Sequence, residues 1–166
     1  MVVASVTMSN AQDAGKFYFG TGFANINYDE SGTKFSSSNI NLTAGYEVSN
    51  YFAIEGEVSV LPVGDTITIS DTTAAVDLTH MGIFARVNLI ESTASFVPYL
   101  RAGWVRGKAT VESGGVSISD TTTGFGYGIG GEYRLADKYS VRLDASKANF
   151  DNSDATVIGI SSVFRF

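Results

Sequence analysis

Residues 124–135 read GFGYGIGGEYRL, and along this stretch a glycine or a charged residue alternates with an aromatic or aliphatic one. Glu132 and Arg134 fall on the same side as most of the glycines. The opposite side carries Phe125, Tyr127, Ile129, Tyr133 and Leu135. Alternation with period two predicts a β-strand with one apolar and one polar face.

The same alternation recurs throughout the chain. It appears again in residues 17–28, 39–48, 52–60, 80–89, 98–105, 139–146 and 157–166. Together these stretches predict eight strands, each close to the ~9–11 residues that a tilted strand needs to cross a bilayer. The connections alternate between short (49–50, 90–95, 136–138) and long (29–38, 61–75, 107–122, 147–155). This spacing predicts an all-β fold, an eight-stranded antiparallel up-and-down transmembrane β-barrel.

Composition agrees with a barrel and limits the other classes of protein. The 166 residues are 44% hydrophobic and only 17% charged, below the roughly 25% charge of a typical soluble domain. No run of 18 apolar residues exists, so a membrane span must be a closed barrel of strands. The net charge of -6 without a basic stretch argues against nucleic acid as a partner. Because cysteine is absent, disulfides and thiolate metal sites are excluded.

The N-terminus has a different character from the rest of the chain. Residues 1–11 are small and apolar and end in Ser9-Asn10-Ala11, which is typical of a signal-peptide cleavage site. The positively charged start of a signal peptide is absent, so we interpret residues 1–11 as a signal-peptide remnant. A polar leader without regular structure is the alternative. We expect a single barrel domain over residues 12–166.

Charge decides which face of the strands points inward. The polar faces hold five carboxylates and five arginines, a balanced set that suits a narrow lumen in which each charge needs a partner. This predicted lumen cluster comprises Glu47, Glu55, Glu57, Arg86, Arg101, Glu132, Arg134, Arg142, Asp144 and Arg165. The alternative is the solvated face of a soluble sheet. Such a face would use lysine freely, whereas the lysines here lie near strand ends or in connections.

Other residues carry weaker predictions. Arg106, Lys108 and Lys147 lie near the outer ends of strands and are candidates for contact with lipopolysaccharide phosphates, although chance placement of rim cations explains them equally well. ISDTT occurs at 69–73 and 118–122, which suggests either duplication of a hairpin or coincidence. The single histidine, His80, has no serine partner in a recognisable hydrolase motif, so we expect no enzyme activity, no metal and no cofactor.

Four segments together resemble the eight-stranded outer-membrane family that includes the OmpA transmembrane domain, OmpX and the opacity-protein barrels. They are KFYFGTGF (16–23), PYLRAGW (98–104), GFGYGIGGEYRL (124–135) and SSVFRF (161–166). The resemblance implies that Arg101 with Glu55, Glu57 and Glu132 plugs the barrel. It also implies that Phe164 and Phe166 form the signal read by the outer-membrane assembly machinery. The chain stops at the eighth strand, so the peptidoglycan-binding domain of OmpA is not expected.

These observations predict a protein of the bacterial outer membrane with both termini in the periplasm and long extracellular loops. The expected function is a structural or surface-interaction role, adhesion-like, with a plugged polar lumen. Outer-membrane lipid and lipopolysaccharide are the expected surroundings, and the sequence does not identify an extracellular partner. The main alternative is a porin-like channel for small solutes. A soluble lipocalin-like carrier and a lipid A enzyme are further alternatives, which require an apolar cavity and a His80–serine pair, respectively.

Overall fold

The computed structural model describes residues 15–30, 33–60, 65–69, 72–113, 116–150 and 154–166. Among them, no helix is long and apolar enough to cross a membrane. The signal-peptide remnant predicted at residues 1–11 lies outside this part of the chain. The described strands are β1 (Lys16–Glu30), β2 (Thr33–Ser49), β3 (Phe52–Val60), β4 (Asp65–Ile69), β5 (Thr72–Asn88), β6 (Phe96–Ser113), β7 (Val116–Arg134), β8 (Tyr139–Asn149) and β9 (Asp154–Arg165).

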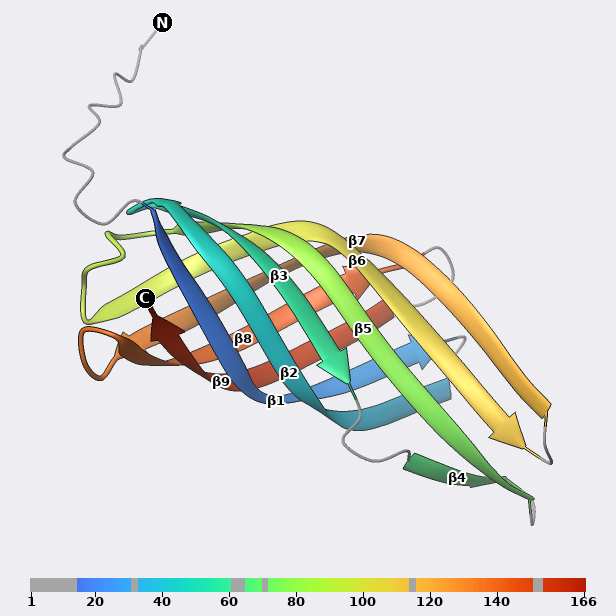
Figure 1. Cartoon of the computed structure of the whole chain (residues 1–166). Coiled ribbons are helices and arrows are strands. Elements are labelled where there is room, and N and C mark those ends of the chain that lie inside the picture. The colour runs from blue at the N-terminus through green and yellow to red at the C-terminus, as the bar shows by residue number, and fades with distance from the viewer. Residues whose placement is uncertain (1–14, 31–32, 61–64, 70–71, 114–115, 151–153) are drawn as a thin grey trace, which may run out of the picture.

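Eight of these strands form a closed antiparallel barrel, which confirms the predicted fold (Figure 1). The first and last strands pair along their length, from Tyr18 opposite Arg165 to Asp29 opposite Asp154. Closure is completed by β3 and β5, which pair from Phe52 opposite Val87 to Ser59 opposite His80. The short strand β4 pairs with β5 beyond the barrel and is not part of its wall.

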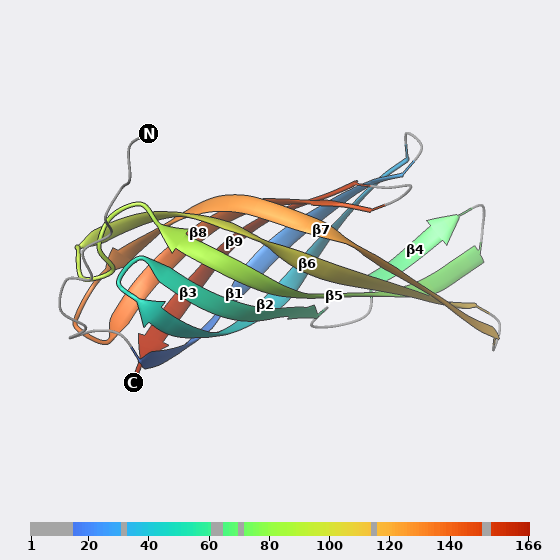
Figure 2. The same cartoon turned by 90° about the horizontal axis from the view of Figure 1, so that it is seen from above.

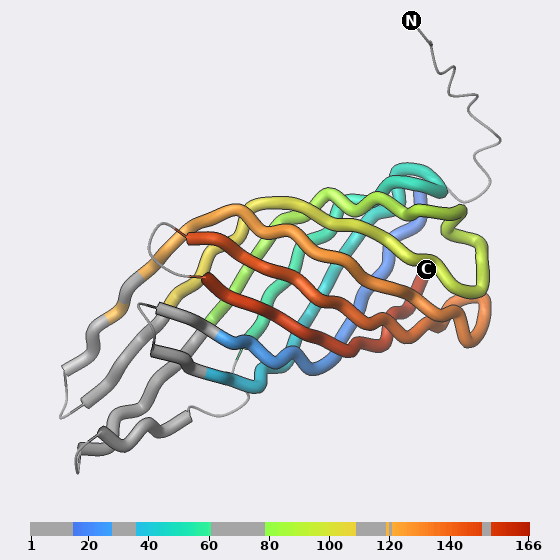
Figure 3. Tube along the Cα trace, turned by 180° about the vertical axis from the view of Figure 1, so that it is seen from behind, coloured from blue at the N-terminus to red at the C-terminus, as the bar shows by residue number. Residues whose placement is uncertain are grey.

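The two ends of the barrel differ. One end, the terminal rim, carries the short connections at 50–51, 89–95 and 135–138. There the amide of Phe166 donates a hydrogen bond to the carbonyl oxygen of Phe17 (3.0 Å). Figure 3 shows the C-terminus at this rim. At the opposite end, the hairpin end, the strands continue well past the barrel (Figure 2). The strands β4, β5, β6 and β7 project furthest on this side (Figure 2).

The prediction of four long loops at the hairpin end was wrong. Strand pairing continues through most of them, as with Asp29 opposite Lys34, Thr110 opposite Ser119 and Thr68 opposite Thr73. Polar Ser, Thr and Asp residues obscured these strands because outside the membrane neither face needs to be apolar, and the pairing depends on the backbone alone. The two ISDTT segments are not equivalent, since 69–73 spans the β4–β5 connection and 118–122 lies within β7.

An apolar band surrounds the barrel, as the predicted side-chain orientation requires. On β2 and β3 it covers residues 40–48 and 52–60. Nine residues tilted by about 40° rise roughly 20–25 Å, which matches the ~25 Å apolar belt of outer-membrane barrels. At the hairpin end the band finishes at Phe23, Met81, Trp104, Phe125 and Ile158. The next outward residues on the same strands are polar, namely Asn25, Thr79, Arg106, Thr123 and Thr156.

Candidate functional site in the barrel interior

The inward face of the barrel collects most of the charged residues that the alternation assigned to it. Eight of them are at most 4% exposed, namely Glu47, Glu55, Glu57, Arg86, Arg101, Glu132, Arg142 and Arg165. Asp144 and Arg134 are only partly buried. Seven of the eight strands of the barrel contribute to this set, because a side chain from every second position on each strand points to the axis.

Glu132 is the central carboxylate of this interior. Its Oε2 lies 3.1 Å from Nη1 of Arg86 and 3.2 Å from Nη2 of Arg142. Its Oε1 accepts hydrogen bonds from Arg165 and from the hydroxyl of Ser140. One carboxylate therefore compensates three buried guanidinium groups that come from three different strands.

Glu55 plays a similar part on the opposite side of the lumen. Its Oε1 accepts hydrogen bonds from Arg142 (2.9 Å), Arg86 (3.3 Å) and the hydroxyl of Tyr18 (2.5 Å). Since Arg86 and Arg142 contact both Glu55 and Glu132, these four residues form one bridged cluster. Such a cluster ties β3, β5, β7 and β8 together across the barrel axis.

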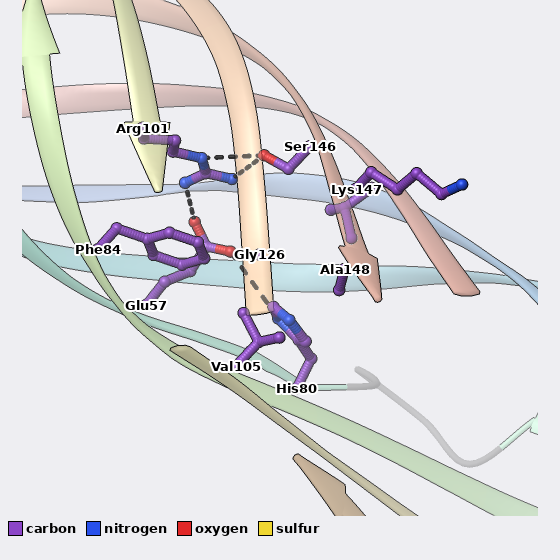
Figure 4. A pocket seen from close by; sticks show the side chains of 10 residues that line it. Glu57, His80, Phe84, Arg101, Val105, Gly126, Ser146, Lys147 and Ala148 are labelled. Carbon is purple, nitrogen blue, oxygen red and sulfur yellow. Dashed lines mark hydrogen bonds and ion pairs between the residues drawn. The ribbon is translucent and has the colours of Figure 1, made fainter. Parts of the chain in front are cut away.

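A second group of polar contacts lies nearer the hairpin end (Figure 4). Arg101 donates to Glu57 Oε2 at 2.6 Å and to the hydroxyl of Ser146 at 2.7 and 2.9 Å. Nδ1 of His80 lies 3.9 Å from Oε1 of Glu57. The hydroxyl of Tyr99 donates to Asp144. His80 thus points into the lumen, toward the carboxylate of Glu57, and the inward Ser59 lies directly opposite it on β3.

The glycines on the inner face of β7 make room for aromatic rings. A Cβ on Gly130 would lie 2.3 Å from the ring of Tyr99, and one on Gly126 would lie 3.1 Å from the ring of Phe84. A larger residue at either position would displace a ring that is 2% exposed or less. The glycine–aromatic alternation of residues 124–135 therefore has a reason on each face of the barrel wall. Its aromatic residues face outward, and its glycines leave space inside for rings from other strands.

The alternation placed Phe84 and Tyr99 on the inward faces, but the sequence reasoning predicted a polar lumen filled by charged side chains and gave these rings no part in it. The guanidinium of Arg86 stacks 4.0 Å from the centre of the Tyr99 ring, and that of Arg101 stacks 4.6 Å from the centre of the Phe84 ring. Cation–π contact compensates part of the cost of burying these cations. The signal was present in the sequence, since Tyr18, Tyr99 and Phe84 lie on the faces that also carry charge.

A buried apolar cluster also occupies the interior, at the hairpin end. We call it the apolar cap, and it consists of Ala24, Ile26, Phe84, Val105, Ala148, Phe150, Ala155 and Val157. The sequence had predicted a polar lumen, but the structure shows that only part of the lumen is polar. Charge fills the half nearer the terminal rim, and aliphatic and aromatic side chains fill much of the other half.

The remaining predicted residues lie on the outside. Arg106 and Lys108 are exposed on the outward face of β6, just beyond Trp104. Lys147 is half-buried and pairs with Asp154 at 2.9 Å. The ring of Phe164 packs 5.0 Å from that of Phe166, which is 70% exposed at the terminal rim. Among the residues that the structure describes, no group of three or more His, Asp or Glu side chains could hold a metal ion.

Comparisons with known proteins agree with this geometry. The attachment invasion locus protein Ail of Yersinia pestis, solved with the heparin analogue sucrose octasulfate, superposes with a TM-score of 0.70 at 20% identity, covering 92% of this chain and 99% of that one. Neisserial surface protein A gives 0.70 at 18% identity and covers 90% and 97%. The N-terminal barrel of Pseudomonas aeruginosa OprF gives 0.65 at 11% identity and covers 92% and 99%.

At these identities the solved structures establish the fold alone. Among curated proteins, no significant match was found. The profile of one family, described as "Outer membrane protein beta-barrel domain", matches residues 1–166, the full length of the sequence. The chain therefore belongs to the outer membrane protein beta-barrel domain family, whose members are barrels of the bacterial outer membrane.

Proposed function

We propose that this protein is a non-conducting outer-membrane barrel that presents its projecting hairpins to a partner at the cell surface. The observation that carries the proposal is the contrast between the two parts of the molecule. The interior is filled by paired charges and apolar side chains, whereas β4 to β7 extend far beyond the apolar band (Figure 2). On this proposal the terminal rim lies in the periplasm and the hairpin end is extracellular.

The projecting strands offer a means of interaction because their backbone is not fully paired. Strand β7 pairs with β8 only from Phe125 onward, so within the described part of the chain residues 116–124 pair with β6 alone. The described pairing of β4 is with β5 only. Strand edges of this kind can bind an extended segment of another protein by adding a strand. Ail, an attachment protein that shares this barrel fold, supports the same kind of role here.

Shortening one hairpin tests the proposal. Lys108 and Thr121 are directly opposite each other, so residues 109–120 can be replaced by Asn-Gly, which favours a two-residue hairpin turn. Vesicles carrying the shortened barrel should lose adhesion to a layer of cultured cells while the barrel still shifts on a gel after boiling. The control replaces residues 28–35 by Asn-Gly between the paired Asn27 and Ser36, and adhesion should persist. Equal adhesion by all three proteins would refute the proposal.

We further propose that lipopolysaccharide phosphates bind the outward cations Arg106, Lys108 and Lys147. Arg106 and Lys108 extend from β6 directly beyond the 76% exposed Trp104, where a lipid headgroup would meet the barrel. Replacing Arg106 and Lys108 by Gln should weaken stabilisation of the barrel by added lipopolysaccharide. Lys138→Gln at the terminal rim is the matched control and should leave that stabilisation unchanged. If both variants respond like the unaltered protein, these cations do not bind phosphate.

The channel alternative makes the opposite prediction. A conducting barrel needs a continuous aqueous path, and the central carboxylates Glu55, Glu57 and Glu132 are each at most 2% exposed. We therefore expect no steady single-channel current in a planar bilayer. Discrete, reproducible current steps from the folded protein would overturn the non-conducting part of the proposal and leave the adhesion experiment as a separate question.

A further inference from the structure

We propose that the apolar cap is the permeability barrier of this barrel, closing the interior to water and ions from the hairpin end. The inference rests on the proposed function of a non-conducting barrel and assigns the closure to particular residues. The charged network in the other half of the lumen would then hold the wall together without being needed as the seal.

The position of the cap supports this role. On every strand that contributes to both groups, the cap residue lies nearer the hairpin end than the charged residue does. Examples are Val105 beyond Arg101 on β6, and Val157 before Arg165 on β9. Anything that enters from the hairpin end therefore meets the cap first.

The cap also closes tightly against the wall. Ile26 and Ala155 are 0% exposed, and the other members do not exceed 8%. The remaining side of this layer is polar. On β2 and β3, Ser37 donates to Asn39 at 2.7 Å and Ser59 donates to Asn41 at 3.2 Å, and on β5 the 2% exposed His80 lies opposite Ser59. Because these Ser and Asn side chains bond to one another, they do not form a path for ions past the apolar residues.

Within the layer of the cap lies a small space, lined in part by the cap residues Phe84, Val105 and Ala148 (Figure 4). His80, Glu57 and Arg101 also line it. The centre of a water-sized sphere can occupy about 10 Å³ of this space. That volume is at the lower limit for one water molecule. Both nitrogens of His80 and Oε1 of Glu57 are buried without a hydrogen bond.

Physical chemistry favours the cap over the network as the barrier. An ion that enters an apolar constriction loses its hydration shell and gains no protein partner. Such a constriction therefore excludes water and ions, even when only a few side chains form it. The network, by contrast, offers carboxylates and guanidinium groups that can exchange one partner for another. The cap is therefore needed to keep ions and water out of the barrel. The charged network can rearrange without opening a path for ions, as long as the cap is intact.

The chain lacks cysteine, so one engineered thiol reports on access to the space within the cap layer. In His80→Cys, placed in lipid vesicles, we would measure the rate of reaction with an anionic methanethiosulfonate reagent, which does not cross lipid. The reference is Thr156→Cys, an exposed position on β9. With the cap intact, we expect Cys at 80 to react about 100-fold more slowly than Cys at 156, since the cap excludes charged solutes.

Opening the cap should expose this thiol. Ile26 and Val157 face each other across β1 and β9, and replacing both by Ser in the His80→Cys background should raise the rate at least about tenfold, because the layer becomes small and polar. The matched control is Val163→Ser, a buried residue near the terminal rim, which should not change the rate. Retention of the gel shift on boiling verifies folding of each variant.

Two results would overturn the inference. One is fast reaction of Cys at 80 while the cap is unaltered, and the other is a folded cap variant that reacts no faster than its parent. Neither result depends on the hairpins that the adhesion experiment alters. Failure of the cap assignment and failure of the surface-interaction proposal are therefore distinguishable.

Discussion

Replacing Glu132 by Gln is the sharpest perturbation that the interior offers. The carboxylate contacts Arg86, Arg142 and Arg165, all at most 4% exposed, and accepts a hydrogen bond from Ser140. Gln keeps the volume but removes the charge, so three buried guanidinium groups lose one of their counter-charges. Breaking one buried ion pair typically costs ~3–5 kcal/mol. Arg86 and Arg142 retain Glu55, and Arg165 retains Glu47, so we expect a loss of about 3–5 kcal/mol rather than three times that value.

The loss is measured as the change in free energy of unfolding in urea, with the protein in lipid vesicles and the fluorescence of Trp104 as the signal. The matched control is Glu91→Gln, an exposed carboxylate at the terminal rim that accepts one hydrogen bond of 3.3 Å from Tyr51. It should change stability by no more than about 0.5 kcal/mol. If Glu132→Gln lies within about 1 kcal/mol of the unaltered protein, the bridged cluster does not stabilise the barrel in the way its geometry implies.

Four further outcomes follow from single residues. Gly130→Val places its side chain against the ring of Tyr99 and should cost about 1–3 kcal/mol in urea unfolding. Gly56→Ala meets only a carbonyl oxygen at 3.9 Å and should be nearly neutral in the same assay. Trp104, the one tryptophan of the chain and 76% exposed, should be quenched strongly by brominated lipid, and emission typical of water would contradict the apolar band. Phe166→Ala should lower the amount of protein assembled in the outer membrane of cells but not refolding in detergent, whereas equal assembly would argue against an assembly signal.

Alternation within the membrane made the barrel predictable from sequence. Each crossing strand must present an apolar face to lipid, so residues such as those of 124–135 carry a period-two signal that side-chain chemistry alone reveals. Outside the bilayer this requirement ends. The outer parts of β6 and β7 pair through their backbones while their sequence is rich in Ser, Thr and Gly, and for that reason they were predicted as a loop at 107–122.

The interior was predictable only in part, for a different physical reason. The charge balance between acids and arginines identified which face points inward, but it does not specify which acid contacts which arginine. That depends on the stagger between strands, which brings Glu55 to Arg142 across the barrel. The role of the inward rings and the apolar cap escaped notice because an inward Val105 or Val157 resembles an ordinary strand residue. Nothing in alternation alone indicates that the polar face of a strand becomes apolar toward one end.

The distribution of charge indicates how the two outer surfaces of the protein differ. The predicted lumen cluster holds five carboxylates and five arginines and is neutral, so the whole net charge of -6 resides elsewhere in the chain. Among the described residues, the segments at and beyond the hairpin end of the apolar band carry seven carboxylates against four cations. They are Asp29, Glu30, Asp65, Asp77, Glu112, Asp120 and Asp154 against Lys34, Arg106, Lys108 and Lys147.

Two of those cations, Arg106 and Lys108, are exposed on the outward face of β6 immediately beyond the apolar band, where they can contact lipid phosphates. The projecting segments themselves are predominantly acidic. An acidic projection repels the phosphates of neighbouring lipopolysaccharide and attracts a cationic partner. Because exposed charges are screened within about 8 Å at physiological ionic strength, adhesion by the hairpins should weaken as salt is raised. Pairing of strand edges through backbone hydrogen bonds is much less sensitive to salt. Adhesion that survives high salt would therefore assign recognition to the strand edges, and adhesion that disappears would assign it to the carboxylates.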